Sequence, residues 1–167
     1  MNEPNPYAPP KARVADPGEP SSGELADRGA RLGAALLDGV ISIVWALPLA
    51  YAFGAFANFP NVVRLPAAKS VGLAVLSFAA FTLVQGYFLK TTGQTIGKKI
   101  VGMRIVTLDG EVPPLGRVLG LRYLPLSIAS LIPYFGGLVN LVDVLLIFRA
   151  DRRCLHDLLA GTRVVKT

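Results

Sequence analysis

Three apolar stretches constrain most strongly what this chain can fold into. Residues 33–57, 71–89 and 118–148 contain few charged side chains. The first two are each close to the roughly 20 residues that a helix needs to cross the hydrocarbon core of a membrane, and the third is longer. Because the membrane interior offers no water, the backbone N–H and C=O groups of a chain that crosses it must form hydrogen bonds with one another, which favours helices. The sequence therefore predicts an all-α membrane protein.

Composition agrees with a membrane protein. Hydrophobic residues make up 52% of the chain and charged residues 17%, with a mean hydropathy of +0.49, whereas soluble domains average about 25% charged residues. The net charge of +6 also suits a nucleic-acid-binding protein. However, the basic residues flank the apolar stretches, and no aromatic-rich basic motif is present. We therefore expect the partners to be the bilayer, with anionic lipid at the cytoplasmic face, and no nucleic acid.

The last apolar stretch predicts a helical hairpin. A proline and paired glycines within residues 133–137 indicate a turn, so helices are expected at 116–132 and 138–150. The second arm holds an apolar run of only eleven residues, about 17 Å of helix, so it either extends into its flanks or is re-entrant. With helices at 30–57 and 71–90, the predicted fold is a small bundle of four membrane-embedded helices.

The distribution of basic residues predicts the orientation. They are concentrated before the first apolar stretch, between the second and third, and after the third, whereas residues 58–70 hold only Arg64 and Lys69. Cytoplasmic loops carry an excess of lysine and arginine. We therefore expect a multi-pass protein of the bacterial inner membrane with both termini in the cytoplasm.

The segments outside the membrane are expected to differ in order. The proline-rich residues 1–24 are typical of a disordered cytoplasmic tail, which leaves residues 25–167 as the transmembrane domain. Residues 100–112 alternate loosely and contain a turn at Asp109-Gly110, and residues 162–165 have strand character. A minor cytoplasmic β-ribbon joining these two pieces is predicted, its edges covered by pairing within or between subunits.

The first predicted helix carries a buried charge. Asp38 lies five residues into the apolar stretch, where a carboxylate costs roughly 2.5–3.5 kcal/mol on insertion scales. Arg31 and Ser42 lie on the same helical face, so an Arg31–Asp38 pair is predicted. The small neighbours Ala34 and Gly39 permit close helix approach. Two interpretations remain: a proton- or cation-handling carboxylate gated by arginine, or a structural ion pair near the interface.

The predicted hairpin repeats this pattern. Arg122 lies in the first arm, and Asn140 and Asp143 lie one turn apart in the second. We expect Arg122 to contact Asp143. The alternative places Asp143 beside Asp38, where two carboxylates would share one proton, as a cation/proton exchanger requires.

The C-terminal segment predicts a short helix capped by Gly161. Within it, His156 is suited to sensing pH, and Asp157 is suited to pairing with a basic residue of the 90–117 loop. Cys154 and His156 supply two metal ligands where four are usual, so no metal site and no cofactor are predicted. The sequence contains no nucleophile motif, and we expect no enzyme activity.

Three segments together carry a resemblance to a known family. They are ARLGAALLD at residues 30–38, GQTIGKKIVGMRIV at 93–106 and RRCLHDLLAGT at 152–162. In this order they resemble the RDD family of small bacterial membrane proteins, named for one arginine and two aspartates. Arg31 and Asp38 match the arginine and the first aspartate. Either Asp157, in its Leu-His-Asp context, or Asp143 is the second.

The resemblance implies two kinds of function. Some family members look like cation/proton antiporters, which suggests a proton-coupled monovalent-cation transporter; a chain this small would work as a homo-oligomer, because alternating access needs an enclosed path. Some eukaryotic relatives look like accessory subunits of membrane quality-control assemblies. The alternative is therefore a membrane scaffold or assembly factor with a protein partner, in which the intramembrane charges are structural ties.

Overall fold

The computed structural model describes residues 23–60 and 64–167. The predicted disordered tail, residues 1–24, lies outside these ranges except for its last two residues. The described chain is mostly helical, with one small sheet.

Two helices are long and apolar enough to cross a membrane. Helix α1 comprises Arg28–Ala52 and α2 comprises Ala67–Thr92, close to the two predicted ranges. Their large apolar side chains point outward: Val44 is 75% exposed and Leu83 is 83% exposed. Such surfaces are suited to lipid contact rather than to water.

The third apolar stretch forms the predicted hairpin. Its first arm consists of α4 (Leu115–Arg117), the π-helix η1 (Val118–Tyr123) and α5 (Leu124–Ser130). Its second arm consists of α6 (Phe135–Leu145) and the 3₁₀ turn η2 (Leu146–Phe148).

The two arms of the hairpin meet closely beside the turn. A Cβ atom added to Gly136 would lie 2.5 Å from the Cα of Ser130, so only glycine fits between α5 and α6. The second arm, Phe135–Phe148, is shorter than a full span; its length of about 21 Å compares with about 30 Å of hydrocarbon core. Within the described ranges, two helices have full crossing length. The prediction of four membrane-embedded helices, in which the last arm was either extended or re-entrant, is therefore supported only for α1 and α2.

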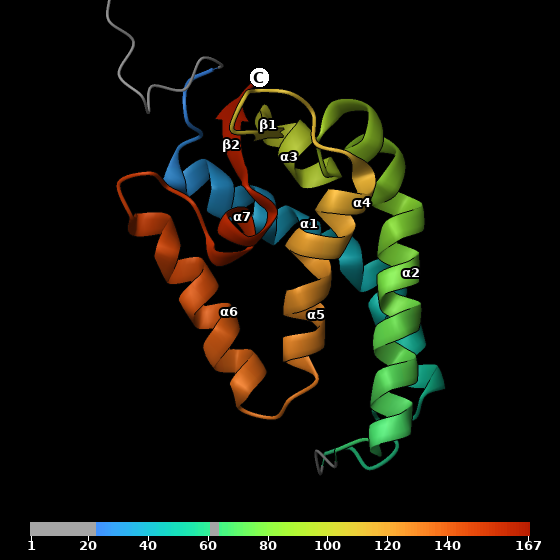
Figure 1. The fold of residues 1–167 in the computed structure, drawn as a ribbon. Helices are drawn as coiled ribbons and strands as arrows, with labels where there is room; N and C mark the ends of the chain where they lie inside the picture. The colour runs from blue at the N-terminus through green and yellow to red at the C-terminus, as the bar shows by residue number, and fades with distance from the viewer. Residues whose placement is uncertain (1–22, 61–63) are drawn as a thin grey trace, which may run out of the picture.

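A small layer, here called the cap, covers one end of the helices (Figure 1). It consists of α3 (Ile96–Val101), β1 (Met103–Thr107), α7 (Leu155–Ala160) and β2 (Thr162–Lys166). Strands β1 and β2 pair antiparallel, with Met103 opposite Lys166 and Thr107 opposite Thr162. The predicted ribbon is thus confirmed. The described N-terminal segment and the C-terminus both lie at the cap.

Both edges of the ribbon are covered within one chain. On the β2 side, Ala26 N donates to Val164 O at 3.0 Å and Lys166 N donates to Glu24 O at 2.9 Å. On the β1 side, Ile105 N donates to Gly93 O at 2.8 Å. Of the two sequence-based alternatives for the edges, pairing within the subunit is the one observed.

The buried core lies where the cap meets the helices. Its residues come from the N-terminal segment, both long helices, both strands and η1; they are Ala26, Ala34, Leu89, Met103, Ile105, Val118 and Val164. Because the same junction also holds the buried charges, the apolar core positions the candidate site.

Candidate functional site

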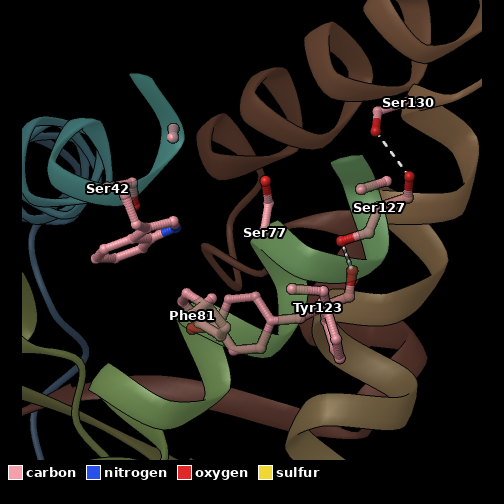
Figure 2. Close-up of a pocket in the computed structure, with 10 residues that line it drawn as sticks. Ser42, Ser77, Phe81, Tyr123, Ser127 and Ser130 are labelled. Carbon is pink, nitrogen blue, oxygen red and sulfur yellow. Dashed lines mark hydrogen bonds between the residues drawn. The ribbon is translucent and has the colours of Figure 1, made fainter. Parts of the chain in front are cut away.

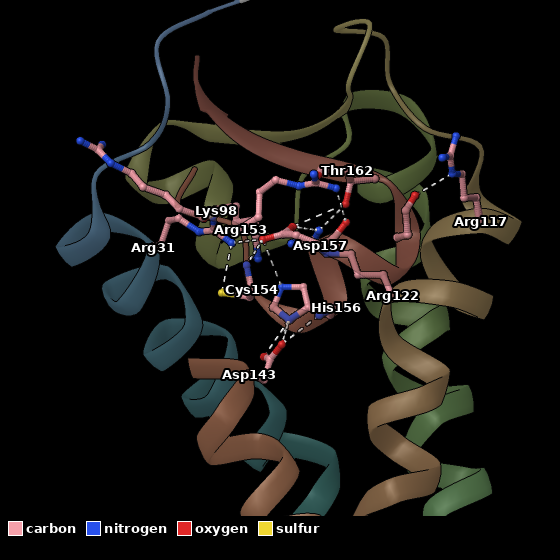
Figure 3. A network of polar contacts seen from close by, with 12 residues as sticks. Arg31, Lys98, Arg117, Arg122, Asp143, Arg153, Cys154, His156, Asp157 and Thr162 are labelled. Atoms are coloured by element: carbon pink, nitrogen blue, oxygen red, sulfur yellow. Dashed lines mark hydrogen bonds and ion pairs between the residues drawn. The ribbon is translucent and has the colours of Figure 1, made fainter. Parts of the chain in front are cut away.

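The Asp157 carboxylate joins three separate elements (Figure 3). It is fully buried and forms ion pairs with Arg31 from α1 and with Arg122 from η1. The backbone N–H of Cys154 donates to its Oδ2 at 3.1 Å. Arg122 also donates to Thr162 Oγ1 at 2.7 Å. One carboxylate therefore fastens the first helix and the hairpin to the cap.

The charges around Asp157 keep it ionised. Burial alone would raise the pKa of Asp157, but the charges of Arg122 and Arg31 outweigh burial and hold this pKa far below its usual range. At neutral pH the carboxylate is a permanent anion between two cations. It is suited to fastening elements and not to exchanging protons.

The C-terminal end of α7 is also held by arginines. Arg117 Nε donates to Ala160 O at 2.7 Å, and Arg153 Nε donates to Thr162 O at 3.1 Å. Gly161 ends the helix with a φ of 58°, as predicted, and a side chain there would collide with Arg117. Arg117 of α4 thus holds the end of α7, and Arg153 ties the segment before α7 to the first residue of β2.

The predicted pairing of Arg31 with Asp38 is wrong. Arg31 instead binds Asp157 and the backbone carbonyl of Arg152. The helical spacing placed Arg31 and Asp38 on one face correctly, but Arg31 lies near the cap end of α1 and its side chain extends into the cap. Asp38 lies two turns farther along and meets α3 instead.

Asp38 accepts hydrogen bonds from α2 and from the loop and helix that follow it. Gly97 N donates to Oδ1 at 2.8 Å and Gln85 Nε2 donates to the same oxygen at 3.2 Å, while the Thr95 hydroxyl donates to Oδ2. Lys98 Nζ lies 3.8 Å from Oδ2. Four donors from α2 and α3 therefore surround a carboxylate of α1.

The donors reach Asp38 because α3 packs directly on α1. A Cβ atom added to Gly97 would lie 2.4 Å from Ala34 O and 2.8 Å from Asp38 Cγ. The small residues of the first helix do permit close approach at Ala34, as the sequence predicted, and the partner is α3.

Asp38 and Asp157 differ in accessibility. The side chains of Asp38 and Lys98 are 16% and 14% exposed, whereas that of Asp157 is 0% exposed. The ammonium group of Lys98, which carries the charge opposite to that of Asp38, also lies farther away than a hydrogen bond. A small ion can therefore reach Asp38 more readily than Asp157.

The predicted contact between Arg122 and Asp143 is also wrong. Asp143 accepts from the backbone N–H of His156 at 2.9 Å, and its Oδ2 lies 2.7 Å from His156 Nδ1. Asp143 therefore contacts α7 rather than Asp38, so the alternative of two carboxylates sharing a proton is not formed either. Asn140 is exposed and lines a cavity of about 320 Å³ together with Arg122 and His156.

The pKa values of His156 and Cys154 are both shifted in the direction that favours the neutral side chain. Burial and the charge of Arg122 lower the pKa of His156, although its hydrogen bond to Asp143 opposes this shift. Burial raises the pKa of the Cys154 thiol to about 11.

The carboxylate of Asp143, the Cys154 sulfur and a ring nitrogen of His156 all lie within 4.8 Å of one another. The structure thus adds a third ligand to the two that the sequence offered.

A hydroxyl-lined cavity begins one turn beyond Asp38 (Figure 2). Its volume is about 310 Å³, and α1, α2, η1 and α5 line it with aromatic side chains and four serines: Ser42, Ser77, Ser127 and Ser130. The hydroxyl of Ser42 donates to Asp38 O at 2.7 Å. A second cavity of about 470 Å³ also includes Ser130 and extends to Arg64. The serine-lined cavity was not predicted from the sequence, because single serines in apolar stretches carry no distinctive spacing.

Comparisons with known proteins confirm the resemblance to the RDD family. The sequence model of the RDD family matches residues 25–161. An uncharacterized protein of Haemophilus influenzae is 33% identical over 152 residues, which cover 89% of this chain and 82% of that protein. The uncharacterized protein YckC of Bacillus subtilis is 35% identical over 135 residues, 80% of each chain. No solved structure matches the chain.

Proposed function

The chain belongs to the RDD family of membrane proteins, and we propose that it exchanges monovalent cations for protons, with Asp38 as the exchanging carboxylate. The observation that carries this proposal is the Asp38–Lys98 pair. Its two charges are 3.8 Å apart, both side chains keep some exposure, and the hydroxyl-lined cavity lies one turn away. A small cation can replace the lysine ammonium at such a site.

The exchange chemistry follows from the groups around Asp38. The carboxylate and the Thr95 hydroxyl supply oxygen ligands, which hard cations prefer. A bound cation displaces Lys98 Nζ, and a proton on the carboxylate removes the charge that holds the cation. Cation and proton therefore compete for one site, and this competition couples their movements.

The serine-lined cavity supports a path leading away from Asp38. Hydroxyl oxygens can replace part of the hydration shell of an ion, as pore-lining oxygens do. Ser130 belongs both to this cavity and to the larger one that extends to Arg64. The path would therefore run from the cap toward the opposite end of the helices.

The proposal includes an orientation in the membrane. The cap faces the cytoplasm, α1 and α2 cross the bilayer, and both arms of the hairpin are embedded, with both termini cytoplasmic. The basic side chains around the cap support this orientation and suit contact with anionic lipid; exposed examples are Lys90, Lys99 and Arg149. Two or more copies enclose the path, because a single chain leaves its cavities open to the sides of the helices.

A second candidate function is a membrane scaffold with a protein partner. The observation that favours it is the Asp157 cluster, in which two arginines from distant segments hold one buried carboxylate. In this interpretation the Asp38 contacts are a further structural tie between α1 and α3. Substitution of Asp38 would then lower the stability of the fold instead of removing an ion site.

Measuring cation-dependent proton flux in proteoliposomes distinguishes the two candidate functions. A pH gradient is imposed, and its collapse is recorded on addition of Na⁺, Li⁺ or K⁺ for the wild type, Asp38→Asn and Lys98→Gln. We expect cation-dependent collapse in the wild type, none in a folded Asp38→Asn variant, and a lower KM for the cation in Lys98→Gln, because the competing ammonium is gone. Glu111→Gln, which removes an exposed carboxylate in the loop after β1, is the matched control and keeps wild-type exchange. Absence of collapse with folded wild-type protein would favour the scaffold.

A further inference from the structure

We propose that Asp143, Cys154 and His156 form a binding site for a divalent transition-metal ion of the Zn²⁺ class. Their ligand atoms lie within 4.8 Å of one another, and the three residues line a cavity of about 90 Å³. Asp143 comes from α6, Cys154 is the N-cap residue of α7, and His156 lies in the first turn of α7. The site would therefore link the embedded hairpin to the cap (Figure 3).

The donor set selects the class of metal. A thiolate sulfur and an imidazole nitrogen favour Zn²⁺, Co²⁺ and related ions over Mg²⁺ and Ca²⁺, which prefer oxygen ligands. Three protein ligands leave one tetrahedral position open, and the cavity gives that position room for water or a small ligand.

Metal binding requires local movement of the three side chains: their ligand atoms, which lie within 4.8 Å of one another, must reach separations of roughly 3.3–3.6 Å, given a Zn–S distance of about 2.3 Å. His156 Nδ1 and Asp143 Oδ2 are 2.7 Å apart, whereas two ligands of a tetrahedral Zn²⁺ ion are about 3.3 Å apart, given metal–ligand distances of about 2.0–2.1 Å. In the neutral tautomer that carries its proton on Nδ1, the ion takes the place of the proton between these atoms. That imidazole proton moves to Nε2, and the Cys154 thiol releases its proton to solvent, so one proton leaves for each ion bound.

Neighbouring groups are placed to support the bound ion. Nε2 of His156 lies 3.8 Å from Asp157 Oδ2, longer than a hydrogen bond; a shift of the ring toward Asp157 on metal binding would let this carboxylate orient it, as carboxylates do behind many metal-bound histidines. Arg31 Nη2 lies 3.5 Å from the Cys154 sulfur and would favour its thiolate form.

The positive groups that line the cavity are already engaged by carboxylates. Arg31 and Arg122 bind Asp157, and Lys98 faces Asp38. Their repulsion of a cation is reduced accordingly.

The test uses the purified full chain in detergent, without a polyhistidine tag and with Co²⁺ as the probe. The chain contains one cysteine and one histidine, so a thiolate-to-cobalt charge-transfer absorption reports Cys154 alone. We expect this absorption to saturate at one Co²⁺ per chain and to be abolished by Zn²⁺ but not by Mg²⁺. Cys154→Ser should lose the absorption, and His156→Gln and Asp143→Asn should each weaken binding by at least about tenfold.

Asp109→Asn, which neutralises an exposed carboxylate in the turn after β1, is the matched control and should bind like the wild type. Circular dichroism establishes that each variant is folded, and Zn²⁺ retained by the wild type after dialysis gives a measurement that needs no variant. The proposal is overturned if folded wild-type protein shows no charge-transfer absorption and retains no Zn²⁺, or if Cys154→Ser binds Co²⁺ unchanged. Because binding is measured without an ion gradient, its failure is distinct from a failure of cation exchange.

Discussion

Asp157 and Asp38 both face basic side chains, but the two carboxylates are held differently. Asp157 is enclosed by two arginines with no exposed surface, while Asp38 has one lysine at 3.8 Å and remains partly exposed. A buried charge whose partner is removed destabilises a fold strongly. We therefore expect substitutions at these two positions to affect different properties of the protein.

Asp157→Asn should lower the free energy of unfolding by about 3–5 kcal/mol, because it leaves two buried guanidinium groups without their anion. Denaturant titration in detergent micelles measures this change. Asp151→Asn, which breaks the exposed pair with Arg149, is the matched control and should cost no more than about 1 kcal/mol. Equal effects of the two substitutions would contradict a structural role for Asp157.

The same carboxylate predicts how stability depends on pH. The pKa of Asp157 is lower in the folded state than in the unfolded state, so its contribution is complete above the usual aspartate pKa of about 3.9. It is lost as the pH falls through the lower, folded-state pKa. Unfolding measured from pH 7 downward should show stability declining in this acidic range, and the decline should be smaller in Asp157→Asn. An equal decline in both proteins would count against this assignment.

At the scale of elements, local patterns predicted the helices well but not the contacts between them. Apolar length and the proline–glycine turn located α1, α2 and the hairpin, and strand character located both strands of the ribbon. The partner of Arg31 lies 126 residues away in sequence, so the periodicity of α1 carried no information about it. The contact between Arg122 and Asp143 was predicted from the distance of each residue from the hairpin turn. That distance carried no information about Asp157, which lies 35 residues from Arg122 in sequence and binds its guanidinium instead.

The contact between α1 and α3 depends on the absence of a side chain at Gly97. Gly97→Ala should lower the free energy of unfolding by about 1–3 kcal/mol, because the added methyl group overlaps Ala34 O and Asp38 Cγ. Gly33→Ala, on α1 with open space around it, is the matched control and should be neutral or slightly stabilising. Thermal unfolding of both variants in detergent measures the difference, and equal melting temperatures would argue against close packing of α3 on α1.

For the whole molecule, the cap collects the charged groups, the sheet and the buried core at one end of the helices. The N-terminal segment joins it through Lys166, which forms ion pairs with Glu24 at 2.9 Å and with Asp27 at 3.1 Å. The rest of the structure exposes apolar helix faces. This division is what a protein embedded in a bilayer with one polar end requires, and the positive-inside rule predicts that this end is cytoplasmic.

The orientation can be tested by labelling single cysteines in a Cys154→Ser background. Ala57→Cys, at the end of the helices opposite the cap, should react with a membrane-impermeant maleimide in intact cells or right-side-out vesicles. Asp109→Cys, on the cap, should react only after the membrane is permeabilised. The reverse pattern would invert the proposed topology.

The most direct test of the central claim is whether cation and proton compete at Asp38. Na⁺ binding to the purified wild-type protein is titrated at a series of pH values, with Asp38→Asn alongside. We predict that the apparent affinity for Na⁺ weakens progressively as the pH is lowered, because protons compete for the carboxylate, and that the folded Asp38→Asn protein binds no Na⁺ at this site. Binding that is independent of pH, or that survives in Asp38→Asn, would contradict the assignment of Asp38 as the exchange site.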